Sequence, residues 1–146
     1  MTESKTAAVT YTTSLAGVEA SMLGGFFEGW RRPLTPQQHL RLLRGSSHVV
    51  LAIDERAGKV VAFINALTDG CNSAFLPMLE VLPGYRRRGV GTELLRRMLQ
   101  VLADYPCIDL TCDPAMQPFY ANCGMQRSVG MAVRDYSRSG PAERGR

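Results

Sequence analysis

Residues 79–95 constrain the fold more than any other part of the chain. They read Leu-Glu-Val-Leu-Pro-Gly-Tyr-Arg-Arg-Arg-Gly-Val-Gly-Thr-Glu-Leu-Leu, which predicts an apolar strand, an arginine- and glycine-rich turn and the start of a helix. Glycine at positions 89 and 91 lets the backbone bend and lets a ligand approach it closely. The helix would direct its first unpaired N–H groups and the positive end of its dipole at the turn. Such a turn binds phosphate, and three arginines add forked donors that suit phosphate oxygens.

Two common phosphate-binding motifs do not fit this turn. No Gly-Lys-Ser/Thr follows it, which excludes a Walker phosphate loop. Leu94 stands where a dinucleotide-binding turn needs a third small residue. The residues alone leave open a patch of arginines that faces solvent or nucleic acid, and we consider this the weaker interpretation.

Length and composition predict one small domain. With 146 residues, of which 45% are apolar, the chain can build a single core. It has no apolar run near the roughly 20 residues that span a bilayer and no secretory signal, so we expect a cytoplasmic protein without membrane contact. The four cysteines form no C-x-x-C pair and have no histidine at metal-ligand spacing, so we expect buried reduced thiols and no metal. His39 and His48 have no partner at useful spacing and look like surface or strand-end residues.

Hydrophobic periodicity predicts an alternation of strands and helices. A capping box, Thr35-Pro36-Gln37-Gln38, marks the start of one helix. Residues 137–146 are rich in Ser, Gly, Pro and Arg, and we expect a disordered basic tail there. The predicted strands are residues 7–13, 48–53, 59–67, 74–82, 107–112 and 125–136, and the predicted helices are residues 14–29, 35–45, about 90–102 and a short one from about 117.

The turn also resembles a family motif. Arg86, Gly89 and Gly91 follow a strand that ends Val-x-Pro, and they match Arg/Gln-x-x-Gly-x-Gly/Ala, the acetyl-CoA-binding motif of the GNAT N-acetyltransferase superfamily. The predicted order of strands and helices also resembles that of the GNAT fold. The resemblance implies an α/β fold (mixed α+β) over residues 1–136. In that fold a central, mostly antiparallel sheet has a V-shaped splay and carries helices on both faces.

The same resemblance implies acetyl-CoA as the co-substrate. The backbone of the turn would hold the pyrophosphate, and the preceding strand would pair with the pantetheine amides as a peptide does at a sheet edge. An arginine of the turn could reach the ribose phosphate. The residues implied in acetyl-CoA binding are Leu79, Val81, Arg86, Arg87, Arg88, Gly89, Val90, Gly91 and Thr92.

Two residues are candidates for proton transfer. The segment Phe119-Tyr120-x-x-x-Gly124-Met125 resembles a second family motif, with Met125 replacing an aromatic residue. The tyrosine of that motif is commonly the general acid, which implies this role for Tyr120; a core tyrosine is the alternative. Glu80 lies beside the expected thioester and is our candidate general base, because partial burial would raise the pKa of its carboxyl. It could instead stabilise a cationic amine or pair with an arginine.

The acceptor side carries no recognisable motif. In this fold the first two helices and their connection usually wall the acceptor pocket, which implies Phe27 and Trp30, and Asn65 is a further candidate. For Trp30, as for Phe26, core packing is the stronger interpretation.

We therefore expect an N-acetyltransferase that transfers acetyl from acetyl-CoA to a primary amine by direct attack in a ternary complex. The amine could belong to a small molecule, a protein N-terminus or a lysine. The alternatives are a non-catalytic acyl-CoA-binding regulatory module and a nucleic-acid-binding module, although nucleic acid is not the expected partner. GNAT domains often pair, so a homodimer is an option.

Overall fold

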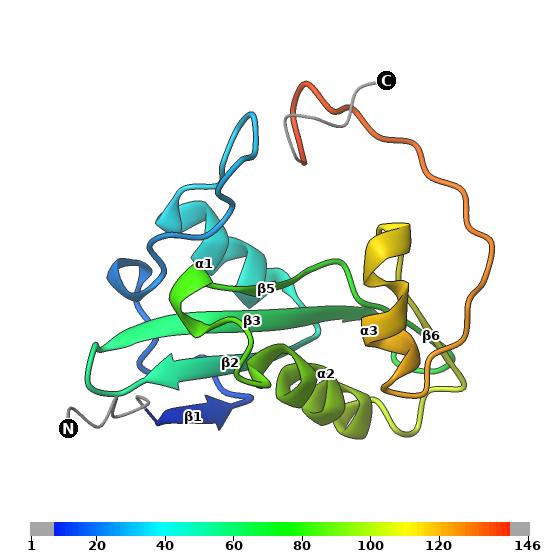
Figure 1. Cartoon of the computed structure of the whole chain (residues 1–146), viewed down its shortest axis with the longest axis horizontal. Coiled ribbons are helices and arrows are strands. Elements are labelled where there is room, and N and C mark those ends of the chain that lie inside the picture. Colours follow the sequence, from blue (N-terminus) through cyan, green and yellow to red (C-terminus); the bar gives the residue numbers. More distant parts are fainter. Residues whose placement is uncertain (1–7, 141–146) are drawn as a thin grey trace.

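The computed structural model describes residues 8–140 and builds one sheet with helices on both faces (Figure 1). The strands are β1 (Val9–Thr12), β2 (His48–Asp54), β3 (Lys59–Thr68), β4 (Ser73–Phe75), β5 (Leu79–Val81) and β6 (Cys107–Asp109). The α-helices are α1 (Pro36–Gly45), α2 (Val90–Val101) and α3 (Gln117–Ala121), and single 3₁₀ turns are η1 (Ala20–Met22), η2 (Pro83–Tyr85) and η3 (Pro114–Met116). The predicted strands over residues 48–53 and 59–67 and the predicted helices after residues 35, 89 and 116 are confirmed.

The sheet is mixed and mostly antiparallel, as expected. Its strand order is β1-β2-β3-β4-β6, and β5 pairs with β3 beside this path. Only the β4–β6 pair is parallel among the described strands. Because β5 pairs with β3 while β6 pairs with β4, β5 and β6 separate, and this separation is the expected splay.

The predicted strand over residues 74–82 is interrupted at residues 76–78. This break divides it into β4 and β5, and the side chain of Asn65 on β3 holds the break in place. Its Oδ1 accepts the Met78 N–H at 3.1 Å, and its Nδ2 donates to Ser46 Oγ at 3.0 Å. The bend therefore has a specific hydrogen-bonded support from the neighbouring strand.

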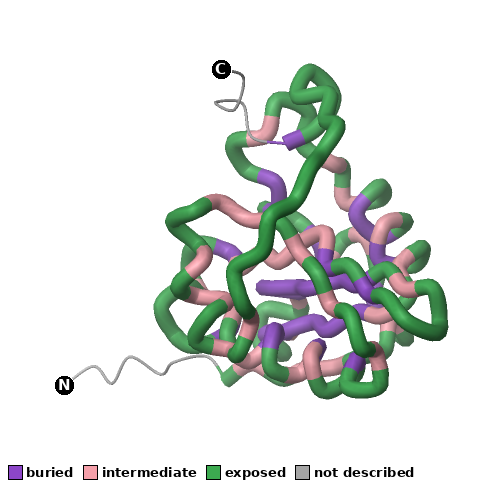
Figure 2. The backbone as a smooth tube through the Cα atoms, turned by 90° about the vertical axis from the view of Figure 1, so that its right-hand side faces the viewer, coloured by how far each residue is buried: buried purple, intermediate pink, exposed green. Residues whose placement is uncertain are grey.

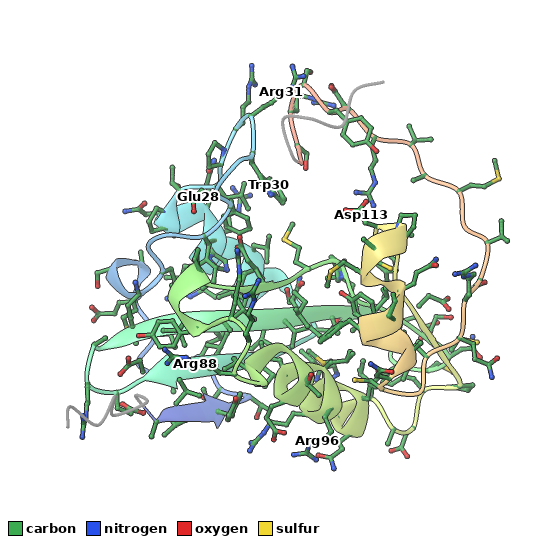
Figure 3. All side chains as sticks on the ribbon, viewed as in Figure 1. Glu28, Trp30, Arg31, Arg88, Arg96 and Asp113 are labelled. Carbon is green, nitrogen blue, oxygen red and sulfur yellow. The ribbon has the colours of Figure 1, made fainter. Side chains whose placement is uncertain are left out.

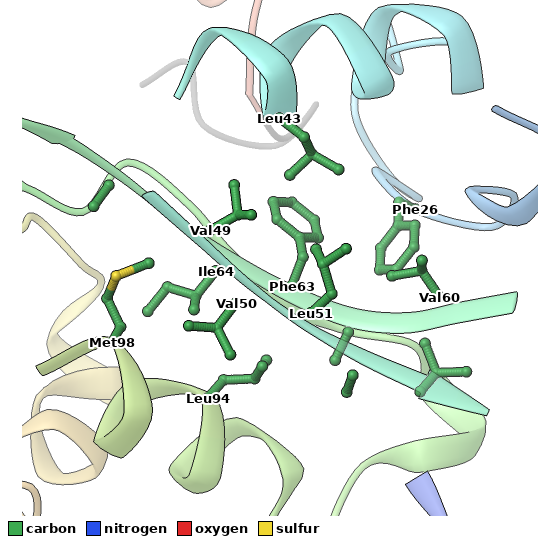
Figure 4. Close-up of a cluster of buried hydrophobic side chains, with 14 of the residues drawn as sticks. Phe26, Leu43, Val49, Val50, Leu51, Val60, Phe63, Ile64, Leu94 and Met98 are labelled. Carbon is green, nitrogen blue, oxygen red and sulfur yellow. The ribbon is translucent and has the colours of Figure 1, made fainter. Parts of the chain in front are cut away.

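Both faces of the sheet are covered by amphipathic helices. At the start of α1, Thr35 Oγ1 accepts the Gln38 N–H at 3.1 Å and Gln38 Oε1 accepts the Thr35 N–H at 2.9 Å, which is the predicted capping box. Figure 4 shows Leu43 of α1 facing Phe63 on one side of the sheet, and Leu94 and Met98 of α2 on the other side. The sheet, with β5, is thus packed between an apolar layer under α1 and another under α2.

The predicted helix over residues 14–29 is wrong. This segment forms loops with one 3₁₀ turn, η1. Its glycines and Phe27 explain the difference, since Gly25 and Phe27 take φ of +92° and +64°, a left-handed conformation that no α-helix contains. The apolar residues at helical spacing still reach the core, because Val18 and Phe26 are buried.

The predicted strand over residues 125–136 is also wrong. The chain there belongs to no strand of the described sheet and runs outside the body of the molecule (Figure 1), and its residues from 126 on are exposed, green in Figure 2. Beyond it, residues 137–139 form a turn on the Asp135 carboxylate. The rest of the predicted tail (141–146) and the predicted start of the first strand at residue 7 lie outside the described residues.

None of the four free cysteines is buried; Cys71 and Cys107 are exposed. His39 is not a surface residue, because it is fully buried against Phe26, Phe27 and Phe63. Of the helices that the structure describes, none is long and apolar enough to cross a membrane.

Candidate active site

The turn after β5 leaves backbone N–H groups unpaired. Gly89 precedes α2 with φ of +78° and has no side chain to cap the helix. The Glu93 N–H is the first of the helix to bond back, to the Gly89 C=O at 3.0 Å. The N–H groups of residues 89–92 therefore point from the helix end toward the turn, as an anion site requires.

The three arginines of the turn do not act alike. The Arg86 Nε donates to the Val81 C=O at 2.9 Å, so this side chain braces the turn against the end of β5. The Arg88 guanidinium lies 5.6 Å from the centre of the Tyr85 ring, and the Tyr85 hydroxyl donates to Asp54 Oδ2 at 2.5 Å. Arg87 is exposed and takes φ of +61°. The turn is thus positive but is shaped mainly by its backbone.

β5 presents an open backbone edge. Along an antiparallel strand, backbone groups point alternately toward and away from the paired strand. The residues that flank β5 show which ones face β3: the Leu82 N–H donates to the Val61 C=O at 2.9 Å, and the Met78 C=O accepts the Asn65 N–H at 3.2 Å. Even-numbered residues thus turn their backbone groups to β3, so Leu79 and Val81 turn theirs away from it. Because β6 pairs with β4, this edge has no strand beside it in the described sheet.

The side chain of Glu80, in the middle of β5, points to the face of the sheet where residue 27 lies. Both of its carboxylate oxygens accept the Phe27 backbone N–H at 3.1 Å. Burial raises the pKa of the Glu80 carboxyl, an effect that the Phe27 N–H and the charge of Arg86 oppose and that the nearby Glu28 carboxylate reinforces. In Figure 3, Glu28 and Trp30 lie above β5 and Arg88 lies below it, so the two charged regions flank the strand.

Tyr120 is half-buried on α3. Burial raises the pKa of its hydroxyl, with a smaller contribution from Cys112. No described residue forms a hydrogen bond with this hydroxyl, unlike the core tyrosine that we considered as the alternative. The ring of neighbouring Phe119 lies 3.5 Å from the position that a Cβ on Gly91 would occupy, so α3 packs directly against the turn.

The three predicted acceptor residues have different surroundings. The Phe27 side chain is only 2% exposed and packs in the core, so its backbone N–H, rather than its ring, faces Glu80. Trp30 is half-buried with its ring centre 5.1 Å from that of Phe27. Asn65 is 2% exposed and both ends of its amide are engaged within the fold. The Phe27 N–H was missed by sequence reasoning, which expected a regular helix there.

The comparison with protein families decides the identity. The sequence model of the GNAT acetyltransferase family matches residues 15–125. The chain belongs to the GNAT acetyltransferase family. Members of this family use acetyl-CoA, and the match places the chain among acetyl-CoA-dependent N-acetyltransferases. No curated protein matches the chain in sequence.

Solved structures agree with this assignment. A proposed acetyltransferase from Deinococcus radiodurans R1 is 42% identical, with a TM-score of 0.87 over 97% of this chain and 100% of that one. Glucosamine-6-phosphate N-acetyltransferase from Arabidopsis thaliana is 16% identical, with a TM-score of 0.64 over 87% and 98% of the two chains. An aminoglycoside N-acetyltransferase in complex with CoA is also 16% identical, with a TM-score of 0.60 over 88% and 93%. The last two similarities concern the fold alone.

Proposed function

We propose that this GNAT protein transfers the acetyl group of acetyl-CoA to a primary amine by direct attack in a ternary complex. In this proposal the residues of the turn and the β5 edge bind acetyl-CoA, Glu80 accepts a proton and Tyr120 donates one. The acceptor is a small-molecule amine or an amine of a protein. The reaction as proposed needs no metal.

One observation supports the proposal: β5 combines an open backbone edge with a half-buried carboxylate, Glu80. Its odd-numbered residues, Leu79 and Val81, turn their backbone groups to an edge without a neighbouring strand in the described sheet, where only the Val81 C=O is engaged, by the Arg86 side chain. This edge leads to the first N–H groups of α2. The even-numbered residue of β5, Glu80, places a half-buried carboxylate on the other face. A donor bound along the edge and an amine bound at the carboxylate would therefore meet beside the same short strand, which is the proximity that acyl transfer requires.

The proposed chemistry balances with these two groups. Glu80, directly or through water, takes a proton from the protonated amine, whose nitrogen then attacks the thioester carbonyl carbon. A C–N bond forms and the C–S bond breaks, which leaves an N-acetylated product and a thiolate. Tyr120 protonates the thiolate, and the remaining proton of the product nitrogen leaves to solvent.

The surroundings of Glu80 favour a cationic acceptor. Glu28 lies close enough to raise the pKa of Glu80, so two carboxylates attract a protonated amine to this side of β5. Half-buried Trp30, from the same segment as Glu28, offers an aromatic surface for the apolar part of the acceptor or for its cationic head.

The test uses two matched glycine variants. Gly89 and Gly58 both take positive φ, +78° and +63°, and a Cβ on either would meet open space. Alanine at either position should cost a similar 1–2 kcal/mol of stability. Only position 89 lies in the proposed phosphate-binding turn, where a methyl group would stand between the backbone and the ligand. We therefore expect Gly89→Ala to weaken acetyl-CoA binding at least tenfold in calorimetry, while Gly58→Ala binds like the natural protein.

The outcomes separate the proposal from its rivals. Saturable binding that only Gly89→Ala weakens, followed by turnover with a panel of amines, supports the proposal. Binding without turnover of any small amine or peptide indicates the regulatory module instead. No binding by the natural protein would sink the acetyltransferase proposal, and the arginine turn would then be tested for salt-dependent nucleic-acid binding.

A further inference from the structure

The tip of the hairpin formed by β2 and β3 is tied to the turn after β5. Asp54, the last residue of β2, is 4% exposed, and its two carboxylate oxygens have different partners. Oδ1 accepts the N–H groups of Arg56 and Ala57 at 3.0 and 3.1 Å, which closes the hairpin turn. Oδ2 accepts the hydroxyl of Tyr85, 31 residues along the chain, at 2.5 Å. The hairpin turn uses only the first oxygen, so the second is available to hold the turn after β5.

The bond between Asp54 and Tyr85 is charge-assisted. It lowers the pKa of the Asp54 carboxyl and raises the pKa of the Tyr85 phenol. The carboxyl is therefore ionised and the phenol protonated at neutral pH. A hydrogen bond from a hydroxyl to a carboxylate is shorter and stronger than one between neutral groups, so this contact is a firm anchor for residue 85.

The backbone after Tyr85 needs such an anchor. Arg87 takes φ of +61°, a left-handed conformation that is strained for a residue with a Cβ and that persists only where its surroundings fix it. On one side, α2 fixes Gly89, whose C=O accepts the first hydrogen bond of the helix. On the other side, the Tyr85 hydroxyl and the Arg86 Nε are both bonded. Arg86 bonds to Val81 of the strand that leads into the turn, so of these two bonds only that of Tyr85 ties the turn to another part of the sheet.

We propose that Asp54 and Tyr85 are positioning residues for acetyl-CoA. The carboxylate fixes Tyr85, and Tyr85 fixes the strained turn and holds the Arg88 guanidinium 5.6 Å from the centre of its ring. This inference rests on the proposed function, in which the turn binds the pyrophosphate. N–H groups that already converge bind a phosphate more tightly than groups that must first be ordered, so the anchor contributes to affinity. Asp54 thus acts on acetyl-CoA without touching it.

Tyr85→Phe isolates the anchoring bond. It removes only the hydroxyl, and it keeps both the ring that faces Arg88 and the Asp54 oxygen that closes the hairpin turn. We expect the Kd for acetyl-CoA, measured by calorimetry, to rise about fivefold or more. Tyr105→Phe is the matched control, because it also removes a hydroxyl bonded to one side chain, but beyond the other end of α2. It should bind acetyl-CoA like the natural protein.

A second variant shows whether Asp54 acts through Tyr85. Asp54→Ser keeps an oxygen that can accept the N–H groups of the hairpin turn, but its side chain is too short to reach the phenol. Alone, it should weaken acetyl-CoA binding about as much as Tyr85→Phe does. The double variant should show no further loss, because the two residues act through one bond. Additive losses would overturn the pathway from Asp54 through Tyr85.

The turn can also be observed without a ligand. Relaxation of ¹⁵N nuclei in the natural protein should give order parameters of a rigid backbone, about 0.85, for the amides of Arg87, Gly89 and Gly91. Tyr85→Phe should lower them toward about 0.6, the range of flexible backbone, and Tyr105→Phe should leave them unchanged. A merely structural role of the Tyr85 hydroxyl would lower stability and move neither the affinity nor these order parameters.

The results separate this inference from the function on which it rests. No acetyl-CoA binding by the natural protein removes the proposed function and the positioning role together. Saturable binding with an equal Kd for the natural protein and Tyr85→Phe removes the positioning role alone. Weaker binding by Tyr85→Phe with unchanged order parameters contradicts the positioning of the turn, since the hydroxyl would then contact acetyl-CoA itself.

Discussion

Burial raises the pKa of both Glu80 and Tyr120, and the two groups have opposite roles in the proposed mechanism. A carboxyl with a raised pKa is a stronger base than an ordinary carboxylate. A phenol is protonated at neutral pH with or without this shift, so Tyr120 holds the proton that an acid must donate. Burial thus strengthens the proposed base, and the proposed acid depends on its position beside the thiolate.

Replacement of Tyr120 by Phe should lower kcat by about 10²–10⁴-fold, because the leaving thiolate loses its positioned acid. Acetyl-CoA affinity should change little, since the ring and its packing remain. Tyr105→Phe is the matched control: that hydroxyl also lies in a half-buried position, but it bonds to Thr68 Oγ1 at 3.2 Å. Steady-state kinetics with calorimetry would check both variants, and equal kcat losses in the two would contradict the acid role.

Replacement of Glu80 by Gln should remove the acidic limb of the pH profile of kcat/KM. The base must be ionised, so activity rises with pH as the carboxyl loses its proton, above the ordinary value because burial raises its pKa. The amide keeps an acceptor for the Phe27 N–H, so the fold should persist. Glu28→Gln removes only a neighbouring charge and should keep the limb, displaced toward lower pH. A Glu80→Gln profile identical to that of the natural protein would exclude the base role.

The elements show how a short bend shapes the site. Residues 76–78 separate β4 from β5 and so let β5 leave the path toward β6. The Asn65 amide is the internal support of this bend, with partners at both ends. Asn65, which the sequence suggested for acceptor binding, therefore supports the strand that carries Glu80.

Replacement of Asn65 by Leu should destabilise the protein by about 1–3 kcal/mol, because the Met78 N–H loses its side-chain acceptor in a buried place. Asn72→Leu changes an exposed amide in the neighbouring loop and should cost about 0.5 kcal/mol or less. Urea unfolding monitored by circular dichroism would compare them. Equal stability of the two variants would contradict the support that we assign to Asn65.

Local signals in the sequence predict some of these elements well. The capping box before α1 and the strand–turn–helix around Gly89 depend on residues close together in the chain, and the structure confirms both. The helix expected over residues 14–29 failed because its apolar spacing reflects core contacts made by loops. The break after β4 depends on Asn65 from another strand, which periodicity cannot reveal. Whether residues 125–136 form a strand depends on a partner outside the segment itself.

The core of the molecule contains a histidine, His39. His39 is fully buried among aromatic rings, and neither of its ring nitrogens has a hydrogen-bond partner among the described residues. Burial lowers the pKa of this histidine to about 4. The folded protein therefore keeps the imidazole neutral at pH values where the unfolded chain would protonate it.

This difference predicts a loss of stability in mild acid. The unfolded histidine begins to bind a proton near pH 6.5 and the folded one near pH 4, so the stability falls as the pH falls between these values. Between pH 7 and pH 5 the loss from His39 should be about 2 kcal/mol. His39→Leu should reduce the slope of unfolding free energy against pH over this range. The same slope in both proteins, measured by urea titration at each pH, would contradict the assignment.

The donor that orients Glu80 belongs to the main chain of residue 27 and not to a side chain. Every amino acid except proline supplies that N–H, so the side chain at position 27 can be exchanged without removing the anchor of the proposed base. Descendants of this protein, natural or selected in the laboratory, can therefore vary the aromatic packing beside the acceptor and keep the same proton acceptor in place. In a library randomised at this position, proline is the one substitution that removes the N–H itself, whereas the other residues are sorted by the buried surroundings and the positive φ.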